Sequence, residues 1–186
     1  MLSWVESVLN TAEWYVNNVN SYSSKKLYEC QIENAGKVRA DCSGFVSCCL
    51  RVAGVLPPGT NYSSDSFVST SGKCAQCLKD AGFESFRYDF QKLQPFDIIA
   101  VSGHVEIFYQ KYGRSGLSYA WGNNHHKAHG GLPCWMTKKN YVTIWRKLSE
   151  QDDISRIISS DDALGIVNPG PEENNDDKNE KRIEDK

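Results

Sequence analysis

The spacing of apolar residues changes along this chain of 186 residues, from a helical period to the composition of strands. Early in the chain, apolar side chains recur three and four positions apart. This pattern predicts helices at about 2–22, 43–52 and 71–82. Later, short runs rich in Ile, Val, Tyr, Phe and Trp are separated by turn residues. These runs predict strands at about 96–101, 105–109, 117–121 and 141–147. Helices followed by an antiparallel sheet predict an α+β domain.

The ends of these segments carry recognisable signals. Ser3, with Glu6 three residues later, fits a capping box at the start of the first helix. Gly54 fits the end of the second helix. The polar segment 23–40 is predicted to be irregular. The segment 55–71, which is rich in Pro, Ser, Thr and Asn, is predicted to be a loop at one side of a cleft.

Charge divides the chain into two parts, although the net charge is only −2. Residues 1–150 are mildly basic and have the composition of one globular domain. In residues 151–186, acidic side chains outnumber basic ones and Asn, Pro and Gly are frequent. We therefore predict one domain over 1–150 and a disordered acidic tail over 151–186.

Several classes of protein are disfavoured by composition. There is no stripe of Lys and Arg typical of a nucleic-acid binder. No apolar run approaches the roughly 20 residues that span a membrane. The first residues lack the basic start and apolar run of a signal peptide, so we expect synthesis in the cytoplasm without Sec export. The seven cysteines, an odd number, are then expected to be reduced.

Two short motifs carry the chemistry. Asp41-Cys42-Ser43-Gly44-Phe45-Val46 places a cysteine at the start of an apolar helix. Gly103-His104-Val105-Glu106-Ile107 places a histidine at the start of an apolar strand. The positive end of a helix dipole favours a thiolate, and a nearby imidazole can act as its base. The pair Cys42 and His104 is therefore predicted to be a cysteine nucleophile with its base.

The residues around the cysteine suggest further roles. The backbone N–H groups of Cys42 and Ser43 could bind a developing oxyanion. Gly44 would leave room for the backbone of a substrate. Asp41 and Ser43 could bind a substrate amine or cap the helix, and both interpretations stay open.

A third group usually holds the ring of a catalytic histidine. We favour Asn123 for this role, followed by Asn124 and His125. A strand paired beside the strand predicted at 105–109 would bring these residues near His104. Trp121 could line a substrate cleft or belong to the core. His125, His126 and His129 are interpreted as a solvated loop rather than as a metal cluster. The pair Cys74 and Cys77 is interpreted as two small residues of a short helix rather than as half of a zinc site.

Together, segments 41–46, 93–99 and 103–107 resemble the NlpC-type cell-wall cysteine peptidases and the related CHAP amidases, over about residues 10–148. The resemblance implies a papain-like fold, with Cys42 as nucleophile, His104 as base and a third polar residue near 121–123. It implies no metal and no cofactor. Two features depart from the family: Phe96 stands where glycine is common, and the Tyr-x-Trp-Gly-Gly stretch before the cysteine is missing, with Tyr22 and Tyr28 available instead.

By this resemblance, the chain is expected to be a monomeric peptidoglycan hydrolase that cleaves stem-peptide or crosslink amides. We expect it to act on the bacterial wall after release or as part of a virion, and a phage lysin is favoured by analogy. One alternative is another thiol acyl-enzyme, either an acyltransferase or a deamidase. Others are a non-catalytic virion or binding module, and a zinc protein that uses Cys74, Cys77 and the loop His125–His129.

Overall fold

The computed structural model describes residues 2–87, 89, 92–110, 115–122, 125–133 and 143–150. For residues 109–133 within these ranges, the backbone is described. The helices are α1 (Trp4–Asn18), α2 (Cys42–Val52), α3 (Ser64–Val68) and α4 (Gly72–Asp80), with a final 3-10 turn η4 (Leu148–Glu150). The strands are β1 (Ser23–Glu29), β2 (Lys37–Ala40), β3 (Phe83–Arg87), β4 (Ile98–Val101), β5 (His104–Gln110), β6 (Ser115–Gly122), β7 (His125–Pro133) and β8 (Thr143–Lys147).

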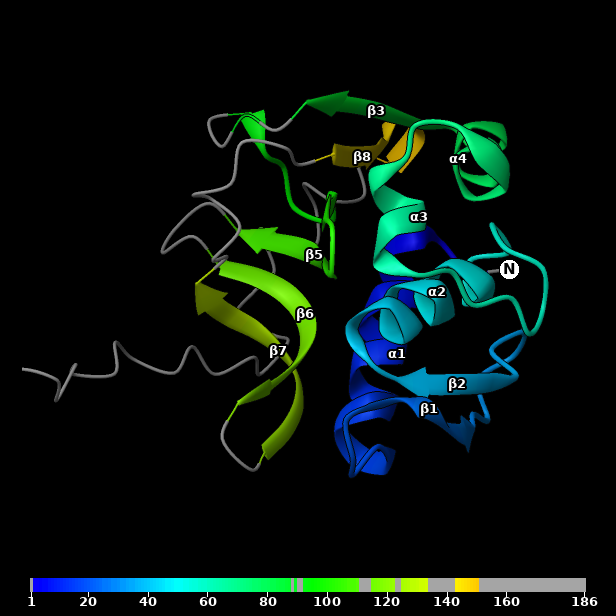
Figure 1. Ribbon diagram of the computed structural model, residues 1–186, viewed down its shortest axis with the longest axis vertical. Helices are drawn as coiled ribbons and strands as arrows, with labels where there is room; N and C mark the ends of the chain where they lie inside the picture. Colours follow the sequence, from blue (N-terminus) through cyan, green and yellow to red (C-terminus); the bar gives the residue numbers. More distant parts are fainter. Residues whose placement is uncertain are drawn as a thin grey trace, which may run out of the picture.

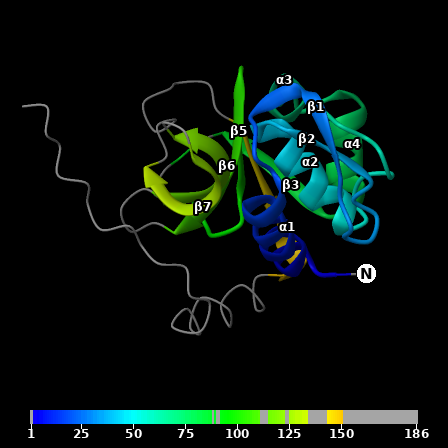
Figure 2. The ribbon, with the colours of Figure 1, turned by 90° about the horizontal axis from the view of Figure 1, so that it is seen from below.

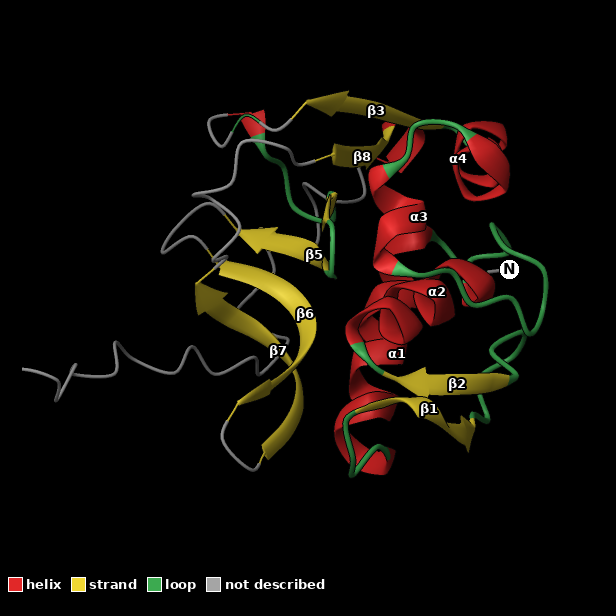
Figure 3. Ribbon diagram, in the orientation of Figure 1, coloured by secondary structure: helices red, strands yellow, loops and turns green. Residues whose placement is uncertain are grey.

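The strands form two antiparallel sheets (Figure 1; Figure 3). Strands β1 and β2 make a separate hairpin. The other six strands form one sheet in the order β3-β8-β4-β5-β6-β7, with antiparallel pairing throughout. The fold is therefore a mixed α+β architecture with helices packed on antiparallel sheets, as the change of hydrophobic spacing predicts.

Helix α2 lies at the centre of this arrangement, between the β1–β2 hairpin and the large sheet (Figure 2). It contacts α1, β2, β5 and β6. Every residue from Cys42 to Val52 is buried. A helix that is covered on all sides belongs to the interior of a domain. Its position is consequently fixed by contacts on every face.

Two tryptophans form hydrogen bonds between the helices and the large sheet. The indole N–H of Trp4 in α1 donates a buried hydrogen bond of 3.0 Å to the carbonyl oxygen of Phe96, which precedes β4. The indole N–H of Trp145 in β8 donates one of 2.7 Å to the carbonyl oxygen of Phe67 in α3. Both rings are also almost fully buried, so each combines apolar burial with a satisfied polar group.

The three predicted helices are present in the structure. The capping box of Ser3 and Glu6 is present at the start of α1. The helix predicted at 43–52 corresponds to α2, and the one predicted at 71–82 corresponds to α4. The four predicted strands correspond to β4, β5, β6 and β8.

Three predictions for the connecting segments were wrong. Segment 23–40 was expected to be irregular but contains the β1–β2 hairpin. Strand β1 is polar and mostly exposed, so it lacks the apolar signal of a strand. Segment 55–71 contains the short helix α3, whose Phe67 is buried. The residues His125, His126 and His129, expected in a loop, lie in strand β7, which pairs with β6.

Strand β3 was not predicted, and it pairs with β8 at the edge of the large sheet. The predicted acidic tail over 151–186 lies outside the described residues. None of the described helices is long and apolar enough to cross a membrane.

Phe96, the residue before Asp97 at the approach to β4, has an unusual backbone conformation. Its φ of 66° lies in the left-handed region, which favours glycine. Its side chain is nevertheless 2% exposed, and its N–H donates a hydrogen bond of 2.5 Å to the carbonyl oxygen of Phe108. The backbone strain, about 1–2 kcal/mol for a residue with a Cβ, is offset by the burial of the aromatic ring.

Replacing Phe96 separates these two contributions. We expect Phe96→Gly to destabilise the protein by about 2–3 kcal/mol, because it loses a buried ring but relieves the strain. Phe96→Ala loses the ring and keeps the strain, so it should be less stable than Phe96→Gly by about 1 kcal/mol. Urea denaturation of both variants measures the difference. An alanine variant at least as stable as the glycine variant would contradict the left-handed conformation.

Candidate active site

The first turn of α2 is held by Asp41, the residue that caps the helix. One carboxylate oxygen, Oδ1, accepts hydrogen bonds from the N–H of Gly44 at 2.5 Å and from the hydroxyl of Ser43 at 3.1 Å. The side chain of Arg39 donates to the Ser43 hydroxyl at 3.0 Å. Of the two interpretations open for Asp41, the helix cap is the one observed. That Asp41 and Ser43 also bind substrate stays a prediction.

Gly44 has a packing role at the start of α2. A Cβ added at this position would overlap the carbonyl oxygen and side chain of Arg39 in β2. The small residue therefore allows β2 to pack closely against the start of α2. That Gly44 also leaves room for a substrate backbone stays a prediction.

Cys42 is the first residue of α2, as predicted, and its side chain is almost completely enclosed, with 5% exposed. The thiol is hydrogen-bonded to the side chain of His104 and to the backbone N–H of Val105. The hydroxyl of Tyr22 lies 3.8 Å from the sulfur. The structure thus brings the predicted pair Cys42 and His104 into direct contact.

His104 is positioned by the tight turn between β4 and β5. It opens β5 opposite Val101, and the preceding Gly103 has a φ of 85°, which favours glycine. Its side chain is 14% exposed. Because β5 packs against α2, a histidine at the start of the strand reaches the start of the helix.

The surroundings of the two groups favour a thiolate beside an imidazolium. Burial, the largest single influence, raises the pKa of the Cys42 thiol, but the hydrogen bond and charge of His104, together with the N–H of Val105 and the hydroxyl of Tyr22, bring the pKa below its ordinary value. Burial lowers the pKa of His104, but hydrogen bonds with Cys42 and Glu106 raise it to about 9. Such an ion pair supplies a nucleophile and an acid in one contact.

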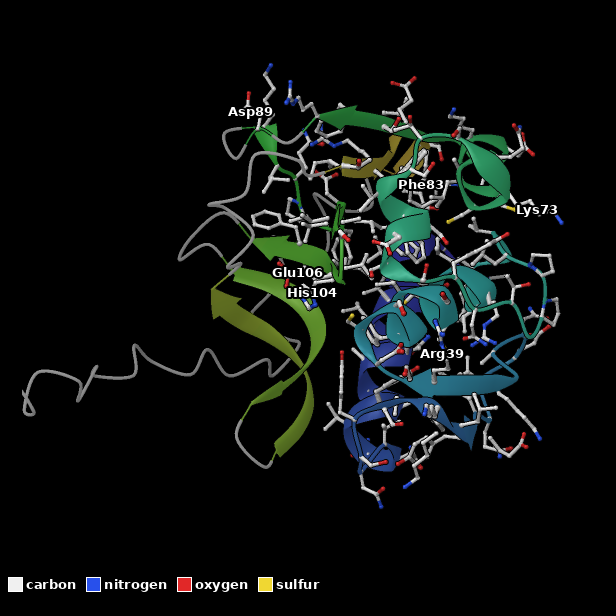
Figure 4. The ribbon with its side chains drawn as sticks, in the orientation of Figure 1. Arg39, Lys73, Phe83, Asp89, His104 and Glu106 are labelled. Carbon is white, nitrogen blue, oxygen red and sulfur yellow. The ribbon has the colours of Figure 1, made fainter. Side chains whose placement is uncertain are left out.

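Glu106 supplies a buried carboxylate behind the histidine. The two residues are two positions apart on β5, so their side chains leave the same face of the strand. The Oε2 of Glu106 lies 3.5 Å from the Nε2 of His104, and the glutamate side chain is 5% exposed (Figure 4). Its other oxygen, Oε1, is buried with no hydrogen-bond partner among the described residues. The carboxylate is therefore placed to orient the ring and stabilise its charged form.

Sequence reasoning did not assign this role to Glu106, although the signal was present in the spacing of His104 and Glu106 along a strand. It favoured Asn123, which, like Asn124, lies outside the described residues. Strand β6 does run antiparallel to β5, as that argument assumed, so Gly122 lies toward the His104 end. The role of Asn123 stays a prediction.

Tyr22 was also not assigned. It follows α1 and precedes β1, and its hydroxyl donates a hydrogen bond to the Cys42 sulfur. Burial, followed by the charge of Cys42, raises the pKa of Tyr22. The hydroxyl therefore stays protonated and remains a hydrogen-bond donor at the site. No spacing signal in the sequence links Tyr22 to Cys42.

The remaining candidates are only partly placed. Trp121 lies in β6 and the three histidines lie in β7, but these side chains are outside the described part. Within the described residues, no group of three Cys, His, Asp or Glu side chains could hold a metal ion. Cys74 is buried in α4, and burial, with the neighbouring Cys77, raises the pKa of Cys74 to about 12.

No protein-family model matches this chain, and searches of curated proteins and of solved structures find no match. The chemical interpretation therefore depends on the geometry of Cys42, His104, Glu106 and Tyr22.

The charge of Glu106 is testable through the reactivity of Cys42. We expect Glu106→Gln to lower the pKa of His104 and thereby to raise that of Cys42, because the imidazolium loses its carboxylate partner. The rate of Cys42 alkylation by iodoacetamide should then rise at a higher pH than in the wild type. Peptide mass spectrometry measures alkylation at Cys42 alone.

Glu84→Gln on β3 provides a matched control, because Glu84 is exposed on the edge strand. An unchanged Cys42 profile in Glu106→Gln, with the fold intact, would show that the carboxylate does not act on the pair.

Proposed function

We propose that this protein is a cysteine hydrolase of peptidoglycan that cleaves amide bonds of the stem peptide or crosslink through an acyl-enzyme. The observation that carries the proposal is the contact of Cys42, at the start of a buried helix, with His104 on the neighbouring strand. The packing of this helix against the antiparallel sheet that bears His104 also supports a papain-like fold.

The residues in the site account for each step of the reaction. The Cys42 thiolate attacks the carbonyl carbon of the amide, and the π electrons move to the carbonyl oxygen. The His104 imidazolium then gives its proton to the leaving nitrogen as the C–N bond breaks, which releases the amine and leaves a thioester. Neutral His104 next removes a proton from water, whose oxygen attacks the thioester. The acid product leaves and the ion pair is restored.

The oxyanion formed in both halves of the reaction needs donors near the sulfur. The backbone N–H groups of Cys42 and Ser43 stand at the positive end of α2. The Tyr22 hydroxyl, 3.8 Å from the Cys42 sulfur, supplies a further donor. Donors fixed before the reaction stabilise the developing charge without reorganisation.

The substrate class rests on the resemblance to NlpC-type peptidases and CHAP amidases in the segments 41–46, 93–99 and 103–107. We propose peptidoglycan as the partner and the bacterial wall as the place of action, reached after release or as part of a virion. The mildly basic composition of residues 1–150 suits a polyanionic wall.

Wall digestion tests the function directly. We expect the wild type to release soluble fragments from purified peptidoglycan, and Cys42→Ala and His104→Ala to release none, because each loses half of the ion pair. Mass spectrometry of the fragments identifies the bond that is cut. Cys77→Ala, a substitution of a half-buried cysteine in α4, is the matched control and should keep full activity.

Two results would overturn this proposal. If no wall type yields fragments while Cys42 alkylates rapidly, an acyltransferase or deamidase becomes the better interpretation. If Cys42 shows the reactivity of an ordinary thiol, a non-catalytic binding module does.

Tyr22 can be tested in the same digestion. We expect Tyr22→Phe to lower kcat by roughly 10–100-fold with little change in KM, because the lost donor acts on the oxyanion rather than on the bound amide. Tyr28→Phe is the control, since the hydroxyl of Tyr28 contacts Ser21 and Asn20 instead. A rise in KM with unchanged kcat would assign Tyr22 to substrate binding.

A further inference from the structure

A small cavity opens between helix α1 and the connection of the β1–β2 hairpin. Its volume is about 330 Å³, and small-molecule sites commonly have volumes of about 300–1,000 Å³. Most of the lining residues come from α1, and the last one lies between β1 and β2. The residues are Asn10, Glu13, Trp14, Asn17, Asn18 and Ile32. The proposed reaction at Cys42 uses none of them.

Helical spacing brings the α1 residues of this cavity together. Their positions recur at intervals of three and four residues, so they share one face of the helix. Trp14 in this row and Ile32 across from it are partly buried, and both pack against the main core. The cavity therefore combines an apolar part that is anchored in the core with polar side chains from the helix.

These polar side chains are available to a ligand. Asn10, Glu13 and Asn17 are exposed, and their side chains form no hydrogen bond or ion pair with other residues in the described part of the chain. Asn18 donates through Nδ2 to the carbonyl oxygen of Trp14 at 2.8 Å, which leaves its Oδ1 as an acceptor. A free amide both donates and accepts hydrogen bonds, as the hydroxyl groups of a ligand do.

The charge of the lining limits the class of ligand. The lining contains one carboxylate, Glu13, and no Lys, Arg or His. An anion would be repelled, and a single carboxylate is too few ligands for a metal site. Because Glu13 is exposed, it also adds little attraction for a cation.

An aromatic ring, amides and an aliphatic side chain together suit a neutral ring that carries several hydroxyl groups. The C–H face of such a ring packs against an indole, and its hydroxyls bond to the amides. This chemistry is that of a sugar.

We infer that the cavity binds a neutral sugar ring of the peptidoglycan glycan strand while the attached stem peptide reaches Cys42. The inference rests on the proposed function, which supplies a substrate that carries sugars. Helix α1 ends at Asn18, four residues before Tyr22, whose hydroxyl lies 3.8 Å from the Cys42 sulfur. Four residues span at most about 14 Å. One sugar with its attached peptide can therefore extend from the cavity to the nucleophile.

Chitotriose, a neutral trimer of N-acetylglucosamine, is the probe for the experiment. It is titrated by calorimetry into the full-length Cys42→Ala variant, in which no cleavage is expected. We expect binding, and we expect Asn10→Ala or Asn17→Ala in the same background to weaken the affinity by roughly 3–10-fold, because each removes an amide that bonds to the sugar. Both positions are exposed on a helix, where alanine is favourable, so the variants should fold. Circular dichroism checks this.

Gln76→Ala provides the matched control. It removes an exposed amide from α4, outside the cavity, and should bind chitotriose as tightly as its parent. Absence of chitotriose binding would overturn the sugar site, and so would an affinity that neither Asn10→Ala nor Asn17→Ala changes.

The titration is separate from wall digestion, so the two proposals can fail independently. Chitotriose binding that Asn17→Ala weakens, without release of wall fragments by the wild type, would overturn the hydrolase and keep the sugar site. Release of fragments without chitotriose binding would overturn the sugar site and keep the hydrolase.

Discussion

The complete burial of α2 is the constraint on which the rest of this structure depends. A helix start has backbone N–H groups without partners inside the helix, and here water is largely excluded from them. A partner must therefore come from the protein: the carboxylate of Asp41 accepts the N–H of Gly44, while the hydroxyl of Tyr22 donates to the Cys42 sulfur beside it. The elements that supply these groups precede the helix in sequence, so α1 and the hairpin must be in place for the site to exist. The geometry of the candidate active site therefore depends on which protein groups lie at the start of α2 and bond to it.

Burial also decides the electrostatics of the site. An isolated charge in such surroundings is costly, which is why burial alone would keep Cys42 and His104 neutral. Contact between the two reverses this preference, since each ion stabilises the other, and Glu106 adds a third charge on the far side of the ring. The arrangement has one negative charge on each side of one positive charge. This set carries one more negative than positive charge, so removing His104 would leave two buried negative charges without a cation, whereas removing Glu106 would leave the neutral pair of Cys42 and His104.

The sequence predicted most of what depends on local apolar patterns and on helix-start signals. The helices α1, α2 and α4, the central strands and the contact of Cys42 with His104 follow from such patterns. Strand β1 escaped prediction because its side chains are mostly polar and exposed, and its pairing with β2 is made by the backbone. Tyr22 escaped because its approach to Cys42 is a tertiary contact between segments 20 residues apart. Glu106 is different: its two-residue spacing from His104 on a predicted strand was visible, and a distant asparagine was favoured over it.

Cys42 and Cys30, whose pKa values are both lowered, illustrate how the partner of a thiolate determines its chemistry. An imidazolium stabilises a thiolate and can also surrender a proton to a leaving amine, which amide cleavage requires. A guanidinium stabilises a thiolate but stays protonated, so Arg51 cannot supply that proton to a reaction at Cys30. The thiol of Cys42, at the start of α2, therefore stands beside a cation that can give up a proton, whereas that of Cys30, after β1, is stabilised by a cation that cannot.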